Sequence, residues 1–130
     1  MELAHEAGAA GRESPHIDYW SWAKTGMVAG IIGGIAFAVF EMIVAAIAAG
    51  NAFGPFRMIA AVALGRQALT PDVSLGVAII AGTLVHLAYS VVAGAVFALI
   101  IAAIRPLHAG KGAIIISASV LGLLMWLLNF

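Results

Sequence analysis

Three apolar runs account for most of this 130-residue chain. The first extends from about Gly26 to Ala49, the second from about Gly76 to Ile104, and the third from Ala113 to Phe130. Each run is close to or above the roughly 20 residues with which an α-helix crosses about 30 Å of hydrocarbon. We therefore expect an all-α integral membrane protein with three transmembrane helices.

The composition excludes several classes of protein. The chain is 64% hydrophobic and only 9% charged, which is too little charge for the surface of a water-soluble domain. Its formal net charge is zero, so it has no basic surface for nucleic acid. It contains no cysteine, which excludes disulfides, thiolate metal sites and iron–sulfur clusters. The expected surroundings are a lipid bilayer and other membrane helices.

The start of the chain differs from the rest in polarity. We predict a polar tail over residues 1–23 with interfacial aromatic residues, followed by a transmembrane domain over residues 24–130. Amphipathic aromatic side chains beside a spanning helix are typical of the headgroup layer. A short interfacial helix around Ile17–Ala23 is an alternative for the end of the tail. The predicted anchors are Tyr19, Trp20, Trp22 and Trp126.

Small residues recur at four-residue spacing in the first two apolar runs. Such spacing forms one flat stripe on a helix, which lets another helix backbone approach closely. Glycine is also common in membrane helices for no such reason, but the regular spacing favours a packing face. The predicted packing positions are Gly26, Gly30, Gly34, Ala38, Gly82, Ser90 and Gly94.

The segment between the first two runs is neither a span nor an ordinary loop. Gly54-Pro55 is a turn signal, and proline suits the first turn of a helix. The 14 residues that follow, FRMIAAVALGRQAL, would form a helix about 21 Å long. We predict an interfacial or re-entrant helix from about Pro55 to Leu69. A fourth, shortened span is the alternative.

Glu41 is an acidic residue inside the first apolar run. A carboxylate at that depth is costly and normally faces protein or water. Gly34 and Gly30 precede it by seven and eleven residues, which places all three on nearly the same helix face. Glu41 is either a proton-carrying or ion-pairing acid, or a hydrogen-bonded residue that joins two helices.

His86 lies inside the second run, on a side lined by small and polar residues. Three roles are open for its imidazole. It could form a hydrogen bond within a helix bundle, pair with Glu41 in a proton path, or ligate a haem or metal ion. No second ligand motif accompanies it, so the sequence predicts no metal site. The remaining histidines are expected to be solvated: His5, His16 and His108.

Glu41 and His86 are expected at a similar depth in the membrane. Counted at 1.5 Å per residue, Glu41 and His86 both lie roughly 13–17 Å from the side on which the first two helices are joined. Arg57 starts the intervening short helix and could reach toward them if that helix dips into the membrane. We predict a buried polar cluster of Glu41, His86 and Arg57.

Several short motifs resemble a group of small bacterial polytopic membrane proteins of unassigned function. The resemblance covers about residues 25–130 and implies that Glu41, Arg57 and His86 belong together, but it brings no activity. We expect the membrane to be the bacterial cytoplasmic (inner) membrane. The motifs are Phe40-Glu41-Met42, Pro55-Phe56-Arg57-Met58-Ile59, Leu64-Gly65, Ala68-Leu69 and Val85-His86.

The distribution of basic residues predicts an orientation. With three spans, the tail and the loop over residues 105–112 share one side of the membrane. The positive-inside rule then places the N-terminus in the cytoplasm. That side holds Arg12, Lys24, Arg105 and Lys111, and the opposite side holds Arg57 and Arg66.

No complete catalytic motif is present in the sequence, so we do not expect an enzyme that acts alone. The small size and the glycine-faced helices favour an accessory or structural subunit of a larger membrane complex, such as a respiratory or photosynthetic electron-transfer assembly. A homo-oligomeric proton or cation channel that uses Glu41 and His86 is an alternative. A haem-anchoring subunit with His86 as ligand is a second one. Whether a lipid or pigment fills the glycine grooves stays open.

Overall fold

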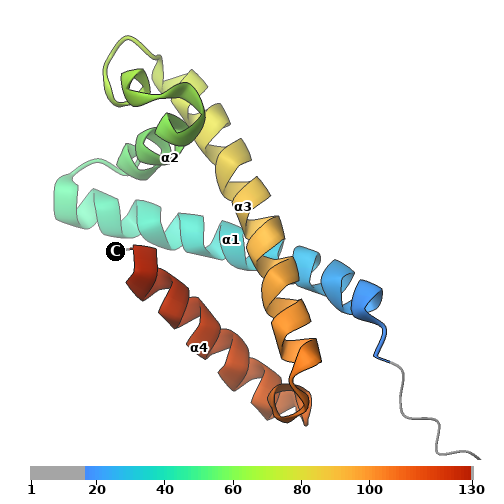
Figure 1. Ribbon diagram of the computed structural model, residues 1–130. Helices are drawn as coiled ribbons and strands as arrows, with labels where there is room; N and C mark the ends of the chain where they lie inside the picture. Colours follow the sequence, from blue (N-terminus) through green and yellow to red (C-terminus); the bar gives the residue numbers. More distant parts are fainter. Residues whose placement is uncertain (1–16, 130) are drawn as a thin grey trace, which may run out of the picture.

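The computed structural model describes residues 17–129; residues 1–16 of the predicted tail and Phe130 lie outside this part of the chain. The described residues form four α-helices with no strand among them (Figure 1). The helices are α1 (Tyr19–Ala49), α2 (Gly54–Leu64), α3 (Leu75–Ala103) and α4 (Lys111–Asn129). Two short 3₁₀ turns, η1 (Arg66–Leu69) and η2 (Arg105–His108), lie before α3 and α4.

Side chains and glycines at the helix ends set the bounds of α1. The Asp18 carboxylate caps its start by accepting hydrogen bonds from the backbone N–H groups of Trp20 (3.1 Å) and Ser21 (3.2 Å). Gly50 ends the helix with φ of 65°, a conformation that favours glycine. The aromatic residues at positions 19, 20 and 22 therefore form the first turns of α1, and the helix continues through them without a break.

The predicted helix between the first two runs is divided in the structure. α2 carries Pro55 in its first turn and ends at Gly65, whose φ of 75° turns the chain into η1. Ser74 then caps α3, because its hydroxyl oxygen accepts from the backbone N–H of Val77 at 3.3 Å. The segment predicted from Pro55 to Leu69 is thus a helix of 11 residues followed by a 3₁₀ turn.

The contact between α1 and α3 is the main one in the fold, and Figure 1 shows the two helices crossing. Gly26, Gly30 and Gly34 of α1 face Ser90 and Gly94 of α3. A Cβ atom at Gly30 would overlap the Ser90 carbonyl, and one at Gly94 would overlap the Gly26 carbonyl oxygen. The predicted stripe of small residues on α1 is therefore the surface that lets the two backbones touch.

The other helices lie against α3 at its two ends. α2 packs on its N-terminal half, where Gly82 lies against the backbone of Phe56. A small cluster of buried alanines, Ala60, Ala68 and Ala78, joins α2, η1 and α3. α4 contacts mainly η2 and α3, and Figure 1 shows it starting at the end of α3 opposite α2 and running back toward the C-terminal half of α1.

The interior of the described chain contains only small residues and one isoleucine at its buried hydrophobic positions. No large side chain there is fully buried. Large apolar side chains instead cover the outside, and Ile47 of α1 and Val62 of α2 are 82% and 79% exposed. An apolar surface of this extent needs lipid or protein around it.

Two helices, and not the three predicted, are long and apolar enough to cross a membrane. They are α1 with 31 residues and α3 with 29, or about 46 and 44 Å. Only 6% and 11% of their most apolar 18-residue windows are buried, so they do not resemble the core helices of a soluble protein. The prediction of a third span was wrong by this criterion, because the corresponding apolar helix, Lys111–Met125, is only about 22 Å long.

We expect Gly30→Ile to destabilise the α1–α3 contact, because its Cβ atom would overlap the Ser90 carbonyl. Overpacking of this kind typically lowers the free energy of unfolding by about 1–3 kcal/mol. The matched control is Gly33→Ile on the same helix, since nothing lies within 4 Å of a Cβ atom there. The control should change stability by less than about 0.5 kcal/mol. Reversible unfolding in mixed detergent micelles measures both, and equal losses would contradict the contact.

Candidate functional site

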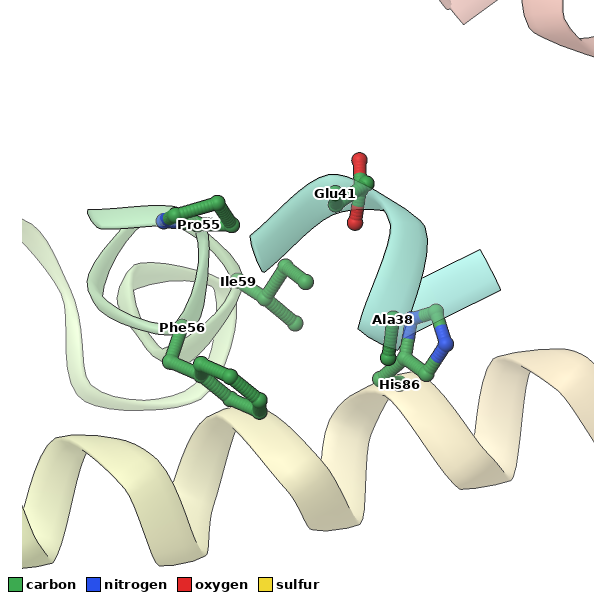
Figure 2. Close-up of a pocket in the computed structure, with 6 residues that line it drawn as sticks. All are labelled: Ala38, Glu41, Pro55, Phe56, Ile59 and His86. Atoms are coloured by element: carbon green, nitrogen blue, oxygen red, sulfur yellow. The ribbon is translucent and has the colours of Figure 1, made fainter. Parts of the chain in front are cut away.

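Glu41 and His86 line the same small pocket (Figure 2). The pocket lies where α1 and α3 diverge beyond their glycine contact and the first turns of α2 fill the space between them. Its space for the centres of water molecules is about 10 Å³, which holds about one water. The lining residues are Ala38, Glu41, Pro55, Phe56, Ile59 and His86.

His86 is held by α1 through its ring. Its Nε2 atom lies 2.8 Å from the Gly34 carbonyl oxygen, and a carbonyl only accepts hydrogen bonds. Nε2 therefore carries the proton, and in the neutral ring Nδ1 keeps a free lone pair. The Ser90 hydroxyl donates to the His86 carbonyl oxygen at 2.7 Å, one turn along α3. The histidine and the glycine contact thus depend on the same close approach of the two helices.

Glu41 reaches the pocket from α1. It is half-buried, and it accepts no hydrogen bond from any residue in the described range 17–129. Ala38 precedes it by three residues and Gly34 by seven, so all three lie on one helix face. Ala38, which has a small side chain, lies beside His86, and Glu41 lies on the next turn of α1 (Figure 2).

Arg57 does not join this pair, although it was predicted in the same cluster. Its side chain turns toward η1 and the loop before α3, where backbone carbonyls lack helical partners. A guanidinium group satisfies such carbonyls at modest cost because it always carries its donors. Its Nη1 donates to the carbonyl oxygens of Ala68 (2.9 Å), Thr70 (3.0 Å) and Val73 (3.1 Å).

The predicted packing residues divide between two contacts. Those of α1 and the C-terminal half of α3 meet each other, whereas Gly82 lies against the backbone of Phe56 in α2. Ala38, the last member of the α1 stripe, lines the pocket. Pro55, Phe56 and Ile59 also line the pocket, but the sequence did not predict this because their side chains are apolar. Their role follows only from the packing of α2.

The predicted interfacial anchors lie at the start of α1. Tyr19 and Trp20 are 50% and 65% exposed, and the Lys24 ammonium group lies 5.6 Å from the centre of the Trp20 ring. Trp22 instead packs on His108 of η2, with ring centres 5.7 Å apart. Contrary to expectation, His108 is not fully solvated, since its Nε2 is buried without a hydrogen-bond partner in the described structure. The side chain of Trp126 lies outside the described part.

The residues present do not favour a haem or metal at this pocket. Within residues 17–129 no group of three histidine or acidic side chains could hold a metal ion. A bond from His86 Nε2 to haem iron would require loss of its hydrogen bond to Gly34. The pocket is also far smaller than a porphyrin. We therefore derive no chemistry through such a group.

Comparison with known proteins supplies no family: no protein-family model, curated protein or solved structure matches this chain. The resemblance to small bacterial polytopic membrane proteins stays a prediction.

Replacing Arg57 with methionine should loosen the segment before α3, because three carbonyls lose their donor. A hydrogen bond to a charged group contributes about 1.5–3 kcal/mol, so amides over residues 68–74 should exchange at least tenfold faster. Hydrogen exchange in lipid nanodiscs measures this. The control is Arg66→Met, since Arg66 is exposed. Unchanged exchange in Arg57→Met would show that the carbonyls do not depend on this side chain.

Proposed function

We propose that this chain is an integral membrane protein that acts as an accessory or structural subunit of a larger membrane complex. The observation that carries the proposal is the absence of any fully buried large side chain among the described residues. Helices that bury mainly glycine, alanine and serine against one another leave their large apolar side chains for lipid or for other subunits.

Membrane insertion is supported by the character of α1 and α3. Both helices expose apolar side chains on all sides that do not face each other, including Ile32, Ile47 and Leu84. A helix that is hydrophobic all round is either buried in a large protein or embedded in a membrane. Since few of these residues are buried within the chain, the membrane is the better explanation.

The need for a partner is supported by α4 and Glu41. α4 packs on little besides η2 and α3, and Ile115, Ile116 and Leu123 on it are 58–66% exposed. Glu41 accepts no hydrogen bond from the described residues, and an acidic residue in a span normally faces protein or water. A neighbouring subunit would provide a surface for both.

We further propose a bacterial inner membrane location with the N-terminus in the cytoplasm and α2 as a re-entrant helix. The contact between Trp22 and His108 supports a shared side for the start of α1 and the end of α3. That side carries Lys24, Arg105 and Lys111, in agreement with the positive-inside rule. The position of α2 between the diverging ends of α1 and α3 supports a re-entrant path.

A homo-oligomeric proton or cation channel is the second candidate. The specific observation in its favour is that Glu41 and His86, from two different spanning helices, line one pocket. Pathways for ions are marked by ionisable residues inside spans. In this case Glu41→Gln would abolish pH-dependent flux in vesicles, whereas an accessory subunit would carry no flux in either form.

Mild-detergent purification of a tagged chain from its native membrane tests the accessory role. We expect one or more larger membrane subunits at fixed stoichiometry in two different detergents. An absorption spectrum of the same sample would show whether the complex is a coloured respiratory or photosynthetic one. An unrelated two-span protein with the same tag is the control for adventitious capture. A lone monomer or a homo-oligomer without other stoichiometric chains would contradict the proposal.

A further inference from the structure

We propose that the pocket between α1, α2 and α3 is a proton-binding site, in which the Glu41 carboxyl group and the Nδ1 atom of His86 share one proton. The inference rests on the membrane placement proposed above. It depends neither on a partner complex nor on transport, so it can be tested on the isolated chain.

The hydrogen bond to Gly34 prepares His86 for this role. Because the Gly34 carbonyl fixes the proton on Nε2, the only nitrogen that can gain or lose a proton is Nδ1. If the ring were instead held through Nδ1, Nε2 would be the nitrogen left free to gain or lose a proton. The tautomer is therefore set by the backbone of α1, and the same helix supplies the carboxyl group.

The pocket allows the two groups to interact without a direct contact. Its water-accessible space of about 10 Å³ is just large enough for one water, and the small residue Ala38 is among those that line it. A water that bridges two polar groups is nearly as favourable as a direct hydrogen bond. The apolar walls formed by Pro55, Phe56 and Ile59 offer no competing hydrogen-bond donor from their side chains.

Charge balance favours the state with one proton. With none, the pair is an anion formed by a carboxylate and a neutral ring. With two, it is a cation formed by a carboxylic acid and an imidazolium. With one proton the pair is neutral overall, whether the proton sits on Glu41 or on Nδ1. Isolated charge is expensive in a membrane, so the neutral pair with one proton is the favoured state.

Other charged and titratable groups near these helices do not supply an alternative partner. On α2, the Arg57 guanidinium is engaged by three loop carbonyls. On α3, Tyr89 is 48% exposed and does not line the pocket. On α1, Lys24 lies beside Trp20 near the start of the helix. The pocket also lacks the three ligands that a metal ion would need, so a proton is the occupant its chemistry fits.

The test uses the isolated chain in lipid nanodiscs, with Glu41→Gln and His86→Gln as separate variants. His86→Gln removes the titrating nitrogen, but its amide can still donate to the Gly34 carbonyl and preserve the helix contact. Infrared spectroscopy follows the carboxylic acid C=O band of Glu41, assigned by its loss in Glu41→Gln. Nitrogen NMR follows the four histidine rings.

We expect Nε2 of His86 to carry a proton at neutral pH while Nδ1 carries none or shares one. In His86→Gln the proton affinity of Glu41 should change by at least about tenfold, and in Glu41→Gln the proton affinity of His86 Nδ1 should change by as much, because the two groups titrate as one pair. His108→Gln is the matched control and should leave the Glu41 band unchanged. Independent titration of the two groups, or a bare Nε2 at neutral pH, would overturn the proposal. If His86→Gln fails to fold, the His86 signals in Glu41→Gln still decide.

Discussion

The close approach of the α1 and α3 backbones is the constraint on which the rest of the structure depends. It is possible only because α1 presents glycine at positions 26, 30 and 34 where α3 presents Ser90 and Gly94. In lipid, apolar side chains gain little by leaving their surroundings, so helix association relies on packing and on interhelical hydrogen bonds. Glycine allows the close packing, because it places no side-chain atom in the contact. The close packing in turn allows an interhelical hydrogen bond, because the Gly34 carbonyl oxygen comes within 2.8 Å of His86 Nε2.

The same crossing creates the pocket. Two helices that touch at one place must diverge away from it, and α2 enters the wedge between them with its proline-containing first turn. His86 lies at the apex of that wedge, where its ring meets Gly34, and Glu41 lies about two turns beyond Gly34 on α1. A Cβ atom at Gly34 would overlap the Ser90 side chain, and so would push α3 and His86 away from the Gly34 carbonyl. The polar pair therefore depends on the packing stripe and is not an independent feature.

Sequence periodicity predicts the faces of the helices well but not the partners of individual polar groups. Four-residue spacing identified the α1 face that meets α3, and the seven-residue separation of Gly34 and Glu41 placed the acid on that face. Arg57 was placed with Glu41 because both were close to the same end of the bundle. Its real partners are loop carbonyls at positions 68, 70 and 73, whose direction depends on the turn at Gly65. Hydropathy alone also counted α4 as a span, whereas its apolar helix falls short of the other two.

Solid-state NMR of the glycine-labelled chain in lipid vesicles would test the central contact most directly. We expect short-range cross-peaks from Gly94 of α3 to Gly26 and Gly30 of α1, because the backbone of Gly94 touches both. Gly33, which faces open space, should give none to α3. Cross-peaks from Gly94 to Gly33, or none between the two helices, would show that α1 and α3 do not meet through the glycine stripe.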